Sequence, residues 1–412
     1  MSHRTASQDA RIDRTATALG SRLRAETTGV LSAVGKLRIP EFVLFFGLIF
    51  EGSMFGLPIP FNQVVVVGII LLAVTRSPQV DLGRLQMLVP LLVIGLFYLA
   101  MLSMFTEATE FAFDWERRLL RLGLTAVFLL VLASGRIDLR SGLAGLAAGM
   151  VFNAIAYYLG LAPDHYAGFL SGFFLDKNVA GMAYAIMGVL LLAVVDRRWV
   201  KVAFVLVFAA LVWLTGSRTS IAAMGAGVGW ILVAPRLPVI GRWILGLLIY
   251  LGVNFVSEDY SQIGIFSDRA GSDLLRSRID AASEVKVDGA GFFGMGLGEA
   301  YVSFPDDPGS KWLFHNSYWS ALVEGGWPWL LLVLGITVVF ALRPFETRLT
   351  KPELAVQAAA ISVLICAWRL GEVFFTLQWA LVVGAAIWFW ANARQESDRR
   401  PHESTTSDGG EG

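Results

Sequence analysis

Twelve stretches of this chain are apolar over most of the length that a helix needs to cross a bilayer, which is roughly 20 residues. They cover residues 41–58, 62–76, 86–105, 117–134, 141–160, 178–195, 199–215, 217–235, 239–256, 316–342, 354–372 and 374–392. The second stretch is short and the fourth contains Arg121, so the expected number of spans is about twelve. With 56% hydrophobic and 16% charged residues, the chain is too apolar for a water-soluble domain. The sequence therefore predicts an all-α polytopic membrane protein.

Basic residues are concentrated in every second connection between these stretches. Short cytoplasmic loops of membrane proteins collect lysine and arginine, and the Arg-rich N-terminal tail begins the alternation here. The basic residues of these connections are Arg76 and Arg84; Arg136 and Arg140; Arg197, Arg198 and Lys201; Arg236 and Arg242; Arg343, Arg348 and Lys351; and Arg394, Arg399 and Arg400. The other connections lean acidic, as at Glu107 and Glu110. We therefore expect both termini to be cytoplasmic.

Two tails and one long connection complete the predicted organisation. Residues 1–40 and 393–412 are expected to be disordered cytoplasmic tails, because their polar composition buries too little surface to fold. Transmembrane helices one to nine would fill residues 41–255, and helices ten to twelve would fill residues 314–392. The connection 256–313 falls on the outer side and is far longer than an ordinary loop. Loops of that length are usually functional or disordered, and we expect this one to be ordered.

Two patterns in the long connection support order. SDLLRSRIDAASEV, residues 272–285, has the periodicity of a short amphipathic helix. GFFGMGLGEA has glycines at the alternate positions 294, 296 and 298. Because no βαβ unit surrounds these glycines, a nucleotide-binding turn is set aside. We interpret the segment as a tight loop in which the backbone approaches other parts of the chain.

Charge and cysteine content exclude several kinds of partner. The formal net charge is zero and no long basic stripe is present, so nucleic acid is not an expected partner. The single cysteine, Cys366, lies in an apolar stretch and has no second cysteine for a disulfide or a thiolate metal site. We expect neither a metal site nor a cofactor, whereas the lipid bilayer is an expected partner.

The segment FHNSYWSALVEGGWPW, residues 314–329, is unusually polar for this chain. His315 stands at the head of the tenth apolar stretch, next to Asn316. An imidazole with an ordinary pKa near 6.5 accepts a proton at neutral pH, which suits a general base acting on a sugar hydroxyl. The alternative is that His315 is a surface residue that caps the helix beside Asn316.

Glu324 lies nine residues after His315, about 13 Å along a helix that rises 1.5 Å per residue. A carboxylate inside a span is costly unless it is paired or faces a wet cavity. Gly325, Gly326 and Pro328 follow it and predict a kink. Glu324 therefore either supports a site beneath His315 or hydrogen-bonds a neighbouring helix.

Basic residues on the outer side break the charge rule and are candidates for anion binding. Arg218 in TGSRTS lies at a turn where a helix begins, and a guanidinium beside a helix N-terminus suits a phosphate. The alternative is an interfacial arginine with Ser217 as an ordinary N-cap. In SGFFLDKNVAGM, Lys177 is placed to contact an anion and Asn178 to cap a helix, and capping is the favoured role for this block.

Arg276 and Arg278 compete for one role in the long connection. If residues 272–287 are helical, Arg276 has Asp273 three residues before it and Asp280 four residues after it, which predicts salt bridges. Arg278 has only apolar residues at those spacings. By this reasoning Arg278 is the freer of the two to bind an external anion.

Four blocks taken together resemble the O-antigen ligase and polymerase superfamily of bacterial membrane glycosyltransferases. They are FFLDKN with AG after it, TGSRTS, the arginine-bearing helix that leads into GFFGMGLGEAY, and HNSYWSALVEGGWPW, in this order from about residue 170 to 335. The family often has an aromatic residue shortly after its loop arginine, whereas Asp280 or Ala282 stands here. The choice between Arg276 and Arg278 therefore stays open.

The resemblance implies a metal-independent, inverting transferase in the bacterial inner membrane, with its active site on the periplasmic face. Its donor would be a glycan linked to undecaprenyl diphosphate, and its acceptor another glycan or a lipid A core sugar. Arg218 and either Arg276 or Arg278 would hold the diphosphate, and His315 would activate the acceptor hydroxyl. Glu324, Asn316, Lys177 and Asn178 are possible supporting residues. The competing hypothesis is a twelve-helix polysaccharide or lipid transporter without transferase activity.

Overall fold

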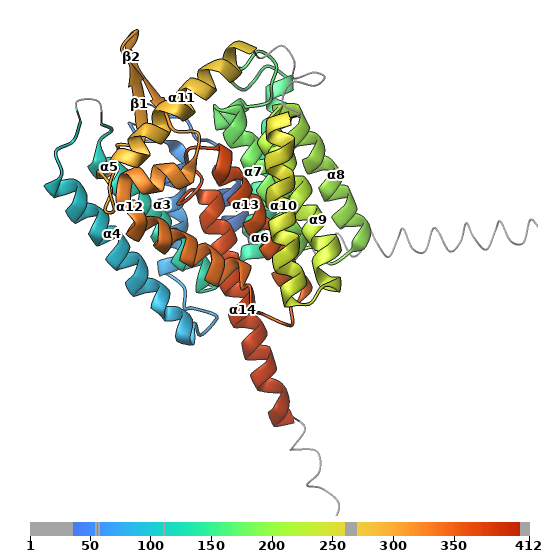
Figure 1. The fold of residues 1–412 in the computed structure, drawn as a ribbon. Coiled ribbons are helices and arrows are strands. Elements are labelled where there is room, and N and C mark those ends of the chain that lie inside the picture. Colours follow the sequence, from blue (N-terminus) through green and yellow to red (C-terminus); the bar gives the residue numbers. More distant parts are fainter. Residues whose placement is uncertain (1–35, 54–55, 57, 110–111, 260–269, 404–412) are drawn as a thin grey trace, which may run out of the picture.

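The computed structural model describes residues 36–53, 56, 58–109, 112–259 and 270–403, which are mostly helical (Figure 1). In chain order the elements are α2 (Ile39–Gly47), α3 (Phe61–Val74), α4 (Leu88–Phe105), α5 (Trp115–Ala133), α6 (Leu139–Tyr158), α7 (Lys177–Leu190), α8 (Arg198–Thr215), α9 (Arg218–Val233), α10 (Val239–Asp259), α11 (Ala270–Gly289), the strands β1 (Tyr301–Phe304) and β2 (Asp307–Leu313), and then α12 (Ser317–Ile336), α13 (Lys351–Arg369) and α14 (Leu377–Glu403). A π-helical turn, Thr337–Leu342, extends α12.

Length and apolar composition suit several of these helices to crossing a membrane. Within the described residues, five segments are long enough: Leu85–Phe105, Leu139–Tyr158, Arg198–Thr215, Ser317–Leu342 and Lys351–Arg369. Three shorter apolar helices are Phe61–Val74, Lys177–Ala193 and Val239–Val253. Each of the twelve predicted stretches contains a helix, but α2 ends after nine residues. The protein is thus a mostly helical protein of membrane type, and twelve spans stay an expectation.

Helix α7 is buried on all sides. Every residue from 180 to 190 is buried, and α7 packs against α8, α9 and α13. Small residues allow this close packing, because a Cβ added to Gly181 would lie 2.7 Å from Ser220 Oγ and 2.9 Å from Thr215 Oγ1. The start of α7, the end of α8 and the start of α9 are therefore fixed against one another at the turn that contains Arg218.

Helix α11 and the β1–β2 hairpin form a cap at the end of the bundle opposite to the end from which α14 projects (Figure 1). A cluster of buried apolar side chains joins this cap to α12; its members are Ile279, Ala290, Ala300, Val302, Phe304, Phe314 and Val323. Helix α11 confirms the amphipathic helix predicted for the long connection. The connection also carries the β1–β2 hairpin, which the prediction of short helices did not include. Tyr301, Val302 and Phe304 favour a strand, and the Pro-Asp turn that follows them favours a hairpin there.

Helix α12 is broken at Gly326, as the Gly-Gly-Pro sequence predicts. Gly326 has φ 62° and ψ −164°, which is far from helical. The segment 292–296 of the cap lies against the break: Met295 N donates to Val323 O at 2.6 Å, and Trp327 N donates to Phe292 O at 2.9 Å. Backbone groups that the break releases are thus bonded within the protein, which is the condition for non-helical backbone in an apolar bundle.

The alternating glycines of the cap confirm the prediction of close backbone approach. A Cβ on Gly294 would lie 2.5 Å from Gly326 N, and one on Gly298 would lie 2.3 Å from Phe113 O. A Cβ on Gly296 would lie 2.7 Å from Thr106 Oγ1. All three have positive φ, which glycine adopts without steric cost. Because these glycines have no side chains, the cap packs closely against the end of α4, the residues before α5 and the break in α12.

Candidate active site

His315 lies in the short connection between strand β2 and helix α12. Asn316 is the N-cap of α12, because its side-chain oxygen accepts hydrogen bonds from Tyr318 N at 2.9 Å and Trp319 N at 3.3 Å. The preceding residue, Phe314, is buried, and its carbonyl lies so close to Gly371 that no side chain fits there. The backbone around His315 is therefore fixed on both sides. Since Asn316 caps the helix, His315 is not needed for capping.

Asp280 of α11 faces His315. The distance from Asp280 Oδ1 to His315 Nδ1 is 3.7 Å, and the two side chains are 28% and 35% exposed. Neither atom has a hydrogen-bond partner among the described residues, although both atoms are shielded from solvent. A carboxylate beside one ring nitrogen of a histidine is the arrangement of an oriented general base, and such contacts are often long before substrate binds. This pairing leaves Nε2 as the nitrogen available to a substrate.

Arg276 lies one helical turn before Asp280 and on the same face of α11. Its Nη2 donates to the carbonyl of Arg369 at 2.6 Å, at the end of α13. The cap thus holds Arg276 one helical turn from Asp280, which faces His315. The salt bridge that the helical spacing predicts between Asp280 and Arg276 is not the nearest contact of Asp280, since His315 lies beside it.

Arg278 points to the hairpin instead. Its guanidinium contacts both carboxylate oxygens of Asp306, with Nη1 to Oδ2 at 2.8 Å, and lies 4.0 Å from the centre of the Phe304 ring. Hydrogen bonding to Arg278 holds the pKa of Asp306 below its ordinary value. The reasoning that made Arg278 the freer arginine was wrong, because its carboxylate partner comes from the hairpin rather than from the helix.

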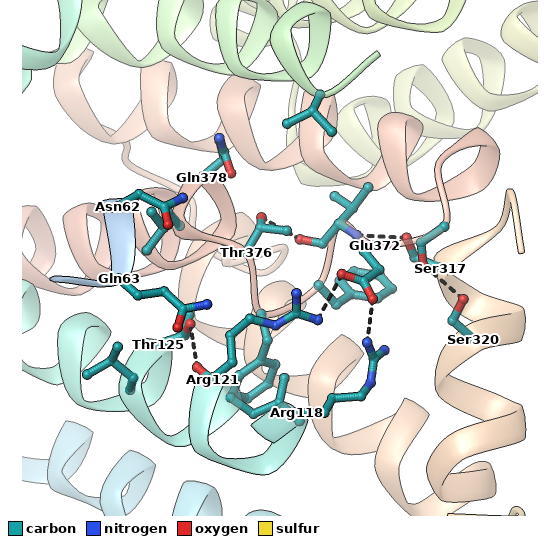
Figure 2. A pocket seen from close by; sticks show the side chains of 18 of the residues that line it. Asn62, Gln63, Arg118, Arg121, Thr125, Ser317, Ser320, Glu372, Thr376 and Gln378 are labelled. Atoms are coloured by element: carbon teal, nitrogen blue, oxygen red, sulfur yellow. Dashed lines mark hydrogen bonds and ion pairs between the residues drawn. The ribbon is translucent and has the colours of Figure 1, made fainter. Parts of the chain in front are cut away.

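A polar cavity of about 250 Å³ lies beneath the first two turns of α12 (Figure 2). Arg118 Nη2 contacts Glu324 Oε2 at 2.7 Å, and its other terminal nitrogen contacts Glu372. Arg121 Nη2 contacts the second oxygen of Glu372 at 2.9 Å. Gly298 N donates to Glu324 Oε1 at 2.9 Å. Both oxygens of Glu324 are therefore used within the protein, which matches the hypothesis that it bonds a neighbouring helix.

Arg218 is the first residue of α9, next to the buried Ser217. Ser217 occupies the N-cap position, but its hydroxyl pairs with Ser220 Oγ at 2.8 Å instead of bonding the backbone. The start of α9 is thus shaped by packing on α7 rather than by an ordinary cap. That Arg218 converges with His315 on one diphosphate stays a prediction.

Lys177 and Asn178 are the first two residues of α7. The cap of this helix is Asp176, whose side chain accepts from Asn178 N at 2.6 Å and Val179 N at 3.1 Å. The assignment of the cap to Asn178 was therefore wrong, since aspartate at the preceding position already meets this need. Lys177 Nζ lies 4.5 Å from the centre of the Phe169 ring, a cation–π contact.

Sequence reasoning did not assign the charged residues of this region to one site. Asp280 was considered only as a partner of Arg276, Arg118 and Arg121 were not proposed for any site, and Glu372 was left open between a hydrogen bond to a neighbouring helix and a direct role. One signal was present, because ionisable residues in apolar stretches usually face a cavity or one another. Arg118 and Arg121 are 14% and 41% exposed and lie on one face of α5 toward the cavity. Among the described residues, no group of three or more His, Cys, Asp or Glu side chains is placed to hold a metal ion.

Comparison with known proteins adds no relative. No model of a protein family matches the chain, and no curated protein is significantly similar to it. The resemblance to the O-antigen ligase and polymerase superfamily therefore rests on the four short blocks and on the side chains that they carry.

Proposed function

We propose that this protein is a membrane glycosyltransferase that transfers or polymerises a glycan carried on undecaprenyl diphosphate, at the periplasmic face of a bacterial inner membrane. The reaction inverts the anomeric centre and needs no metal ion. The observation that carries the proposal is the Asp280–His315 pair, 3.7 Å apart, on a cap that also presents Arg276. It supplies a base, a group that orients the base, and a cation.

In the proposed reaction His315 Nε2 takes the proton of the acceptor hydroxyl. Asp280 accepts a hydrogen bond from Nδ1–H, so it selects the tautomer and stabilises the imidazolium that forms. The hydroxyl oxygen attacks the anomeric carbon of the donor, and the bond from that carbon to the diphosphate oxygen breaks. The electron pair of this bond leaves with the lipid diphosphate.

The leaving diphosphate needs fixed positive charge close to the developing oxyanion. Arg276 is the best-supported residue for this role, because its guanidinium lies at the end of α13 and Arg276 stands one helical turn from Asp280, which faces the base. Arg218 is the second residue that we assign to the diphosphate, on the strength of its place at the outer end of α9. Arg278 remains a weaker candidate, because binding an anion there would require it to leave Asp306.

An apolar groove supports the assignment of a lipid-linked donor. It has a volume of about 420 Å³ and lies between α10, α12 and α13. Tyr318 and Trp368 line it, and these residues lie three positions after His315 and one before Arg369. A polyprenyl tail in this groove would place its diphosphate near the base and Arg276. The acceptor is either another glycan or a lipid A core sugar.

Replacement of His315 tests the proposal. In the purified protein, His315→Ala should abolish transfer from a polyprenyl-diphosphate glycan, while binding of the donor is retained. His165, a histidine in an outer connection, gives the control His165→Ala, which should transfer normally. Full transfer by a correctly folded His315→Ala protein would contradict the proposed mechanism.

The polar cavity gives one reason to keep a second candidate, a transporter for polysaccharide or lipid. Transporters often place ionisable groups inside the bundle near the substrate path, as Arg118 and Glu324 are placed here. Proteoliposomes that move a lipid-linked glycan across the bilayer without making a glycosidic bond would establish this alternative.

A further inference from the structure

The polar cavity beneath α12 contains more hydrogen-bonding groups than the protein itself satisfies. The side-chain amides of Asn62, Gln63 and Gln378 line it, together with the carboxylate of Glu51 (Figure 2). None of these four side chains makes a hydrogen bond within the described part of the chain, and Asn62 Oδ1 is fully shielded from solvent. Buried polar groups in folded proteins are almost always bonded to protein, water or ligand. The cavity is therefore built to hold something polar.

The charges in the cavity argue against an anionic occupant. Three carboxylates, Glu51, Glu324 and Glu372, line it together with two guanidinium groups, Arg118 and Arg121. Both arginines already contact carboxylates. A phosphate or diphosphate would thus meet cations that are already neutralised, so an anion belongs elsewhere.

The chemistry of the unsatisfied groups fits hydroxyls. A primary amide offers both donors and an acceptor, and a carboxylate offers acceptors, so the set matches groups that donate and accept at once. Aromatic side chains complete the lining, since Trp329 and Phe375 also face the cavity, with ring centres 5.0 Å apart. Amides and a carboxylate combined with aromatic faces suit a ring that carries hydroxyls on its edge and C–H groups on its faces.

The size and the position of the cavity limit which molecules fit in it. A volume of 250 Å³ equals about eight water molecules at roughly 30 Å³ each, which leaves room for one sugar ring and not for a chain. Ser317, the first residue of α12, lines the cavity and lies two residues after His315. The cavity therefore begins just below the proposed base.

We propose that this cavity binds one uncharged sugar residue, the terminal sugar of the acceptor, through Asn62, Gln63, Gln378 and Glu51. The acceptor is favoured over the donor because the reacting sugar of the donor carries the diphosphate directly, which the charge of the cavity disfavours. The role as acceptor rests on the proposed function, whereas the binding of an uncharged sugar does not.

Direct binding of simple glycosides tests this site. The full-length protein in lipid nanodiscs is titrated with the methyl glycosides of glucose, galactose and N-acetylglucosamine, and saturation-transfer NMR is recorded. For a ligand of about a dozen non-hydrogen atoms, a dissociation constant on the order of 1 mM is expected for the preferred glycoside. Asn62→Leu and Gln378→Met, which nearly preserve side-chain volume, should each weaken binding roughly tenfold.

Two controls separate this site from the donor site and from general damage. Gln86 is an exposed glutamine remote from the cavity lining, and Gln86→Met should bind glycosides as the wild type does. Farnesyl diphosphate, a probe for the donor site, should bind all three variants equally. Two variants of different helices are used, so that a folding failure in one, detected by thermal melting, leaves the other as the test.

The outcomes are distinct. No glycoside binding by the wild-type protein at tenfold the expected constant, or undiminished binding by both folded cavity variants, would overturn the sugar site even if transfer activity is found. Loss of farnesyl diphosphate binding in the cavity variants would show that the cavity holds the anion, and would overturn it too. Glycoside binding that depends on Asn62 and Gln378 supports the site even if His315→Ala remains active, a result that would refute the proposed function alone.

Discussion

The break in α12 gives the most quantitative prediction. Gly326 has φ 62° and ψ −164°, a conformation open essentially to glycine alone. A Cβ added there would lie 2.1 Å from Phe292 O and 2.4 Å from Phe293 C. Both atoms belong to backbone of the cap, which has no flexible side-chain end that is able to swing aside. Gly326→Ala must therefore push the cap segment away from the helix.

The cost follows from what this movement breaks. Three backbone hydrogen bonds join the segment 292–296 to α12, at 2.6, 2.9 and 3.1 Å. At about 1 kcal/mol each they contribute roughly 3 kcal/mol, and the strained conformation adds about 1–3 kcal/mol for any residue with a side chain. We expect Gly326→Ala to lower the free energy of unfolding by about 4–6 kcal/mol, a large part of the stability of an ordinary protein.

The measurement is reversible unfolding of the purified protein in mixed micelles, with Gly335→Ala as the matched control. Gly335 lies in the same helix and nothing lies within 4 Å of a Cβ placed there. Because alanine is the better helix former, Gly335→Ala should raise the free energy of unfolding by up to about 1 kcal/mol. A Gly326→Ala protein within about 1 kcal/mol of the wild type would refute the view that cap and broken helix form one unit.

Three further predictions concern charged residues. Arg118→Met leaves the buried Glu324 without its cation and leaves Glu372 with Arg121 alone, and it should cost about 3–5 kcal/mol in the same unfolding assay; a change below about 1 kcal/mol would mean that the ion-pair network is dispensable. The contact with Arg278 lowers the pKa of Asp306 in the folded state. The stabilising effect of this pair is therefore present above about pH 4, the unfolded value, and is lost as the pH falls through the folded pKa. Amide hydrogen exchange in the hairpin should thus become faster on acidification in the wild type, and this acceleration should be absent in Arg278→Gln. Asp280→Asn should reduce transfer at least about 100-fold with little change in donor affinity, because the carboxamide no longer selects the tautomer of His315; unchanged turnover would remove Asp280 from the mechanism.

Local sequence patterns predicted much of the scaffold. The apolar stretches each contain a helix, SDLLRSRIDAASEV lies within α11, and the Gly-Gly-Pro run marks the break of α12. The alternating glycines also predicted close backbone approach. These features succeed because the causes act within a few residues: hydrophobic period, backbone freedom of glycine and the missing N–H of proline.

The candidate site was predicted less completely. His315 was identified from its residue type and its place at a helix head, and Asn316 from its proximity. Its partner Asp280 lies 35 positions away in sequence and was assigned to Arg276, because spacing along one helix was the only geometry available. The same limit explains Arg278, whose partner Asp306 is 28 residues away on the hairpin.

The sequence by itself therefore determined that this chain forms apolar helices, where one of them breaks, and which polar residues stand at the helix ends. Only the tertiary structure decided which charges meet, as when Arg118 of α5 contacts Glu372, 254 residues away, at the edge of a polar cavity. The physical reason is that an ionised group in an apolar bundle is stabilised by whichever opposite charge the packing brings within reach. That choice depends on the arrangement of helices in space, and no period along the chain encodes it.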